Sequence, residues 1–176
     1  MGCILINRIL SALDSNILVH SFKTNLMKYT SEITVNLPRE KFIEKLDDPE
    51  NMKHWQKGLI SYELLSEDPT KEGSQMRLNY KMGKRDLEMV ETIISRNLPD
   101  SMHTTYETNG VTNIQKNKFL QEEGKTRWVS ENEFQFSGLG MKLMGFLMPG
   151  MFKKQSMKYL QDFKAFAEEG KSVLDQ

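Results

Sequence analysis

The sequence has few of the features that mark metal, disulfide-bonded or nucleic-acid-binding proteins. Among its 176 residues the only cysteine is Cys3, so no disulfide can form within the chain, and the three histidines are not grouped as in a zinc site. Lys and Arg total 24, as do Asp and Glu, so there is no net charge to attract nucleic acid. We therefore expect no metal, no cofactor, no nucleic-acid partner and a cytoplasmic location.

Long apolar runs are also missing. The first 26 residues contain an apolar series, but Arg8 and Asp14 interrupt it and it is too short to span a bilayer. A true start at Met27 and a loosely attached helix both remain open for this stretch. The chain then divides into a doubtful extension (1–26), a single domain (27–170) and a short tail (171–176).

Methionine, in contrast, is abundant, with 12 residues in the chain. Its flexible thioether side chain suits irregular apolar spaces, including binding cavities. The remaining composition, with 38% hydrophobic and 27% charged residues, is typical of a globular protein.

The chain from Met27 onward predicts one strand, two short helices and six more strands. Residues 29–36 alternate in polarity, as a half-buried strand does. A helix through Phe42 follows, and Asp48-Pro49 provides the N-cap and first residue of a second. Further strands are predicted at 59–66, 75–82, 87–96, 102–108, 111–120 and 127–136.

Two local signals define the second half of the chain. Asn109-Gly110 predicts a tight hairpin in which both residues have positive φ. From Gly140 apolar residues recur every three or four positions, which predicts an amphipathic helix ending near Gly170. Pro149 lies inside this pattern and predicts either a kink or a longer helix that begins near it.

This order of elements is an α+β plan, and parts of it resemble a known family. Glu32–Pro38, Asp48–Trp55, the run of hairpins and Met141–Phe152 are similar to the SRPBCC superfamily, also called the START or Bet v 1-like fold. Small bacterial polyketide cyclase/dehydrase-like proteins are the nearest subgroup. The resemblance covers 27–170 and implies a helix-grip fold: a curved seven-stranded antiparallel sheet wrapped on a long C-terminal helix, with an internal cavity for an apolar ligand.

Strand periodicity suggests which side chains would line such a cavity, because alternate residues share a face. In 111–120 the asparagine face is preferred, since burying Lys116 and Lys118 would cost more than burying amides. In 87–96 neither face is preferred, so Glu91 stays unassigned. The candidate ligand-binding residues are Trp55, Met76, Leu78, Tyr80, Tyr106, Asn113, Asn117, Trp128, Asn132, Phe134, Met144, Met148, Met151, Gln155 and Tyr159.

Catalytic candidates are few. His54 would be a base at a cavity mouth, although a surface role is the commoner one for such a histidine. Glu91, if buried, would have a raised pKa and could transfer protons. The leading hypothesis is binding or carriage of a small hydrophobic molecule, lipid-like or aromatic. The alternatives are a cyclase or dehydratase using the same cavity and, less favoured, an interaction module resembling Hsp90 activators.

A basic stretch in the last predicted helix raises the question of membranes. Lys142, Lys153, Lys154 and Lys158 occur there without an acidic residue between them. Such a face can contact an anionic membrane or simply be the solvated side of a packed helix, and the second interpretation is preferred. A monomer and a homodimer are equally compatible with the sequence.

Overall fold

The structure is a computed structural model that describes residues 26–137 and 149–175. The expectations for the N-terminal extension and for 138–148 lie outside these residues. The elements in chain order are β1 (Leu26–Val35), α3 (Arg39–Leu46), η1 (Pro49–Asn51), α4 (Met52–Trp55), β2 (Leu59–Leu64), β3 (Gln75–Met82), β4 (Arg85–Asn97), β5 (Ser101–Thr108), β6 (Val111–Glu122), β7 (Lys125–Phe136), α6 (Pro149–Glu169) and η2 (Val173–Asp175).

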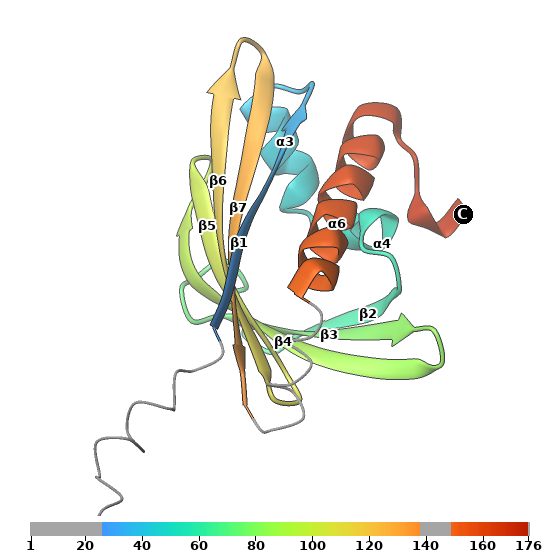
Figure 1. The fold of residues 1–176 in the computed structure, drawn as a ribbon. Coiled ribbons are helices and arrows are strands. Elements are labelled where there is room, and N and C mark those ends of the chain that lie inside the picture. The colour runs from blue at the N-terminus through green and yellow to red at the C-terminus, as the bar shows by residue number, and fades with distance from the viewer. Residues whose placement is uncertain (1–25, 138–148, 176) are drawn as a thin grey trace, which may run out of the picture.

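The seven strands form one antiparallel sheet in the order β1-β7-β6-β5-β4-β3-β2. Strands β2 to β7 follow one another as neighbours, and β1 pairs with β7 at the far edge. The sheet curls around α6, and α3 and α4 lie at one end of the concave side (Figure 1). This is the predicted α+β helix-grip fold, so the expected architecture is confirmed.

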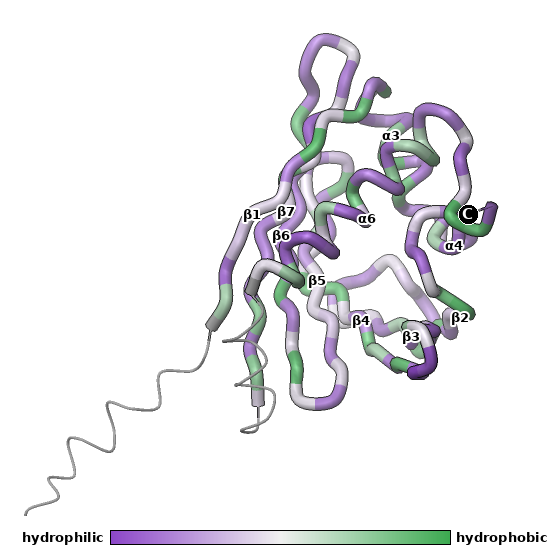
Figure 2. The backbone as a smooth tube through the Cα atoms, turned by 45° about the vertical axis from the view of Figure 1, so that its right-hand side comes forward, coloured by the Kyte–Doolittle hydropathy of each residue, from purple (hydrophilic) through white to green (hydrophobic). Residues whose placement is uncertain are grey.

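Hydrophobic and hydrophilic residues alternate along the strands, as Figure 2 shows. The predicted strands agree closely with the observed ones: β3 spans the predicted 75–82, while β4 and β6 extend beyond their predictions. The hairpin at Asn109-Gly110 is confirmed by the pairing of Thr108 with Val111. Among its two residues only Gly110 has positive φ, at 76°.

The turn with two positive φ values instead joins β6 to β7. There Glu123 has φ 43° and Gly124 has φ 80°. Asn109 therefore does not adopt the predicted left-handed conformation, although it lies in the predicted hairpin.

The helix ends follow the sequence signals. The Asp48 side chain accepts a hydrogen bond from the Glu50 backbone N–H at 2.9 Å, as expected of an N-cap. Helix α6 begins at Pro149, the predicted position of a longer helix. It ends before Gly170, whose φ of 70° favours glycine and whose N–H donates to the Phe166 carbonyl at 2.9 Å.

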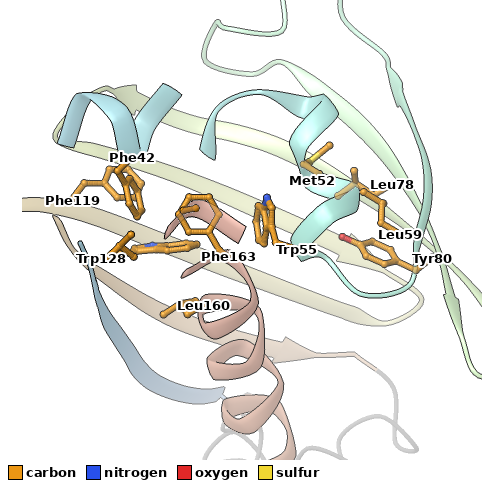
Figure 3. Packing of buried hydrophobic residues seen from close by; sticks show 12 residues of the cluster. Phe42, Met52, Trp55, Leu59, Leu78, Tyr80, Phe119, Trp128, Leu160 and Phe163 are labelled. Atoms are coloured by element: carbon orange, nitrogen blue, oxygen red, sulfur yellow. The ribbon is translucent and has the colours of Figure 1, made fainter. Parts of the chain in front are cut away.

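The core centres on Phe163 of α6 (Figure 3). Its ring is fully buried and lies 5.0 Å from Phe42, 5.4 Å from Trp55 and 5.5 Å from Trp128, measured between ring centroids. All three contacts are edge-on, the favoured arrangement of aromatic rings. One side chain thus joins α6 to α3, to α4 and to the sheet.

Polar contacts hold the other side of α6 against β1. The Tyr29 hydroxyl lies 2.9 Å from Ser156 Oγ, and Lys164 Nζ donates to the Thr34 carbonyl at 2.6 Å. The helix packs chiefly against β1 and α4. In Figures 1 and 2 the curled strands β3 and β4 lie on the opposite side of α6 from β1. The helix is therefore displaced toward one half of the sheet.

We expect Phe163→Ala to lower the free energy of unfolding by about 3 to 5 kcal/mol, because it removes three aromatic contacts and leaves a cavity. Met151→Ala on the same helix is the control; Met151 is half exposed, so its loss should change stability by less than about 0.5 kcal/mol. Urea unfolding followed by circular dichroism measures both. A Phe163→Ala loss below about 1 kcal/mol would contradict the central role of this ring.

Candidate functional site

The inner face of the sheet is defined in every strand from β3 to β7. In β4, the strand left unassigned by the sequence, Glu91 and Ile93 are buried and face the same side as Leu87 and Met89. A bulge after Ile93 then shifts the alternation, and Ile94 is 49% exposed. Glu91 therefore lies on the inner face.

This inner face is not uniformly covered. Leu78, Phe119 and Trp128 are buried in the core, but Met76, Leu87, Met89, Met102 and Tyr106 stay half-buried although they point inward. These half-buried residues lie on β3, β4 and β5. The strands concerned are those that lie away from β1, against which α6 chiefly packs. Among the described residues, these side chains on β3 to β5 pack against the core without being fully buried.

Glu91 is the ionisable group at the centre of this region. It pairs across the strands with Tyr106 and is only 9% exposed. Burial raises its pKa from the ordinary 4.5 to about 7, because a charged carboxylate loses its hydration. The nearby Tyr106 hydroxyl lowers the pKa, Asp47 raises it, and Arg96 lowers it.

Arg96 does not neutralise Glu91, because it is already paired. Its guanidinium makes two hydrogen bonds to Asp47, one of them from Nη1 to Oδ1 at 2.7 Å, and contacts the Met102 sulfur at 3.6 Å. Among the described residues no basic side chain lies within ion-pair distance of Glu91. Glu91 is thus a buried carboxyl that lacks a cation within this part of the chain.

Three tyrosines share the interior with Glu91. Burial raises the pKa of Tyr80 and Tyr106 well above 10, and it raises that of Tyr159 as well. The pKa of Tyr80 is also raised by the charges of Tyr159, Tyr106 and Glu91, so each of these groups lies within electrostatic range of Tyr80. The Tyr80 hydroxyl donates to Gln56 Oε1. All three tyrosines stay neutral near pH 7, and only Glu91 among the four titrates there.

Comparison with known proteins identifies the family. Residues 27–168 match a family described as polyketide cyclase / dehydrase and lipid transport. The chain belongs to this family. It is of the SRPBCC type, which confirms the resemblance drawn from the sequence. None of the curated proteins is similar enough in sequence to count as a match.

Solved structures of other proteins have the same fold as this chain, although their sequences are at most 16% identical to it in the examples below. TTHA0849 from Thermus thermophilus has a TM-score of 0.66 and 16% identity, covering 82% of this chain and 99% of its own. Ara h 8.0201 has a TM-score of 0.65 and 12% identity, and the match covers 81% of this chain and 97% of Ara h 8.0201. Ginseng major latex-like protein 151 from Panax ginseng has a TM-score of 0.64 and 11% identity, and the match covers 81% of this chain and 97% of the ginseng protein. At these identities the likeness concerns the fold alone.

Several residues that the sequence predicted to line the cavity are core residues in the structure. Trp55, Leu78 and Trp128 are at most 8% exposed and belong to one packed cluster. The Trp128 indole N–H donates to Asn117 Oδ1 at 2.8 Å, so Asn117 positions the indole. Trp55, Leu78 and Trp128 thus belong to the packed core.

Asn132 and Asn113 form an amide network on the inner face. The Asn132 amide donates to Ser130 Oγ at 3.1 Å, and Asn113 donates to Asn132 Oδ1 at 3.3 Å. Asn113 Oδ1 is buried without a hydrogen-bond partner among the described residues. Phe134 is half-buried and packs on Phe152 of α6, with 4.9 Å between ring centroids.

The lid residues expected on the last helix have different placements. Tyr159 is half-buried beside the Glu91 group, while Gln155 is exposed and hydrogen-bonds Tyr159. Met151 is 50% exposed. It lies nine residues from buried Leu160, two and a half helical turns away, and hence on the opposite side of α6. Met144 and Met148 lie outside the described residues.

His54 is held by the C-terminal tail. Its Nδ1 lies 3.0 Å from Ser172 Oγ, and its ring stacks on Phe166 at 5.4 Å between centroids. These contacts give His54 a structural role in joining α4 to α6 and the tail. Two shallow hollows on the described surface lie apart from Glu91, one around Lys116 and one beside Tyr62.

Residues of the site that sequence reasoning missed are Leu87, Met89, Thr104 and Gln56. A sequence signal for the β4 residues existed. A two-residue turn at Gly83-Lys84 pairs Met82 with Arg85. The same register then pairs Leu78 with Met89 and Met76 with Glu91, as the structure shows. Paired residues share a face, so the inner face of β3 assigns that of β4.

The described residues contain no group of three His, Cys, Asp or Glu side chains that could hold a metal ion. No helix in 26–137 or 149–175 has the length and apolar character needed to cross a membrane.

The raised pKa of Glu91 predicts a pH-dependent stability. Between its unfolded value of 4.5 and about 7, the folded protein binds more protons than the unfolded one, so stability falls as the pH rises through this window. Relative to Glu91→Gln, the wild type should lose roughly 2 to 3 kcal/mol between pH 5 and pH 8. Urea unfolding at several pH values measures the difference.

Glu88→Gln is the matched control, because Glu88 is exposed on the other face of the same strand. Its stability should follow that of the wild type across the range. Parallel pH profiles for wild type and Glu91→Gln would show that the Glu91 carboxyl does not titrate as expected.

Proposed function

We propose that the chain binds a small hydrophobic molecule between α6 and the inner face of β3, β4 and β5. The observation that carries this is the half-buried state of Met76, Leu87 and Met89, which point inward and pack against the core without being fully buried. Inward-facing apolar surface that remains accessible favours an apolar ligand through the hydrophobic effect. The family description, which includes lipid transport, supports the same conclusion.

The energetics are sufficient for such a role. Each buried methylene contributes about 0.8 kcal/mol, so ten of them contribute about 8 kcal/mol before the entropic cost of association is subtracted. The polar groups of Glu91 and Tyr106 occupy the same face and would orient the ligand. Apolar walls with a few polar atoms are the usual composition of a small-molecule site.

A matched pair of substitutions on β4 tests the location. Met89→Trp adds bulk to the inner face and should weaken binding of the neutral probe N-phenyl-1-naphthylamine at least about tenfold. Ile94→Trp adds the same side chain to the bulge residue, which is 49% exposed, and should leave binding unchanged. Fluorescence titration gives both affinities. Equal affinities for the two variants would place the site elsewhere.

A second candidate function is catalysis of the cyclase or dehydratase type. The observation in its favour is Glu91, a buried carboxyl with a pKa of about 7 beside the Tyr106 hydroxyl. A group with such a pKa both donates and accepts protons near neutral pH, as an enolisation or dehydration requires. In this role Glu91 would be the acid–base group and Tyr106 would hydrogen-bond a substrate oxygen.

The two functions are separated by the fate of a bound molecule. Native mass spectrometry of the protein from its own host would detect a retained apolar compound. Incubation of that compound with wild type and with Glu91→Gln then follows its chemical conversion. Conversion by wild type alone supports catalysis, whereas an unchanged compound with either protein supports carriage.

A further inference from the structure

The charges of the interior are unevenly matched. Asp47 is paired with Arg96, and Asp162 is paired with Lys158 through Oδ1. Glu91 makes no ion pair with any described residue, and Asp162 Oδ2 is buried without a partner there. Of the two buried carboxyls among the described residues, Glu91 is therefore the one without a cation.

The Glu91 carboxylate also accepts fewer hydrogen bonds than it has acceptor positions. Its side-chain hydrogen bond among the described residues is with the Tyr106 hydroxyl, which also contacts Thr104. Thr104 is completely buried. It lies two residues before Tyr106 on the inner face of β5 and opposes Ile93, two residues after Glu91. A hydroxyl acceptor and a carboxyl thus neighbour each other on adjoining strands. An ammonium group offers three donors and no acceptor, and therefore complements this arrangement.

We propose that the hydrophobic ligand carries a basic nitrogen, and that its protonated amine lies against Glu91 and Tyr106. This rests on the proposed function and adds the class of the ligand's head group. An anionic head group would meet the Glu91 carboxylate as a like charge in a region of low dielectric constant. An amine instead provides the missing counter-ion, which removes the cost of an unpaired buried charge.

The neighbouring groups leave Glu91 as the one that responds to pH in the physiological range. It is faced by Tyr106 from β5, by Tyr80 from β3 and by the pair of Asp47, which follows α3, with Arg96 of β4; Tyr159 of α6 lies near Tyr80. The tyrosines have raised pKa values and stay neutral. Amine binding should therefore strengthen as Glu91 ionises.

The test compares dodecylamine, dodecan-1-ol and dodecanoate as competitors of N-phenyl-1-naphthylamine, below their micelle concentrations. At pH 8 the amine should bind at least about tenfold more tightly than dodecanoate, which corresponds to about 1.4 kcal/mol. Between pH 8.5 and pH 5.5 amine binding should weaken about 30-fold as Glu91 takes up its proton, while alcohol binding stays constant. The zero net charge of the chain gives the amine no general advantage.

Two variants test whether the preference for the amine depends on the Glu91 carboxyl. Glu91→Gln should bring amine and carboxylate to within about threefold of each other and remove the pH dependence, since no charge remains to pair. Glu88→Gln, which removes a charge from the exposed face of the same strand, should behave as wild type.

The outcomes separate this inference from the proposed function. Equal or tighter binding of dodecanoate, or an amine preference retained in Glu91→Gln, overturns the amine assignment while leaving hydrophobic binding intact. Failure of the probe and of all three compounds to bind overturns both. Tighter amine binding in wild type and Glu88→Gln, lost in Glu91→Gln, supports both.

Discussion

The contact of Phe163 with Phe42, Trp55 and Trp128 is the interaction on which the arrangement of this protein depends. Through it a single ring of α6 is joined to both short helices and to the sheet. Hydrogen bonds to β1 hold the same helix from its other side. With α6 fixed at this end of the sheet, the inner face of β3 to β5 keeps apolar side chains that are only half-buried. The tightly packed core and the accessible inner face are two consequences of one placement.

Glu91 lies at the boundary between these two regions, and its burial carries a cost. A carboxyl of pKa about 7 has lost part of its hydration without gaining a cation among the described residues. Residues placed at the expense of stability are concentrated at functional sites, because a ligand or substrate can supply the missing interaction. The neutral tyrosines around Glu91 keep the charge change confined to this one group. Binding and proton transfer would both use this property, which is why the two candidate functions share a site.

Much of the fold followed from local signals, and part of the site did as well. Alternation assigned the inner residues of β3 and β7, and the asparagine face of β6 was preferred correctly because two lysines resist burial. Glu91 stayed unassigned because the apolar residues of β4 occur on both faces and a bulge after Ile93 shifts the pattern. Alternation also could not distinguish Trp128, which packs in the core, from Tyr106 on the same face of the sheet. That difference depends on where α6 lies.

The sequence by itself determined the order of the elements and allowed a helix start at Pro149, and its turn signal at Gly83 was enough to align β3 with β4, because capping, turn and periodicity signals act between near neighbours. The tertiary structure decided which inward-facing residues are core and which remain accessible. It also brought Asp47 to Arg96, and so left Glu91 without that cation. These outcomes depend on contacts between residues distant in sequence, and the position of one helix across a curved sheet sets them.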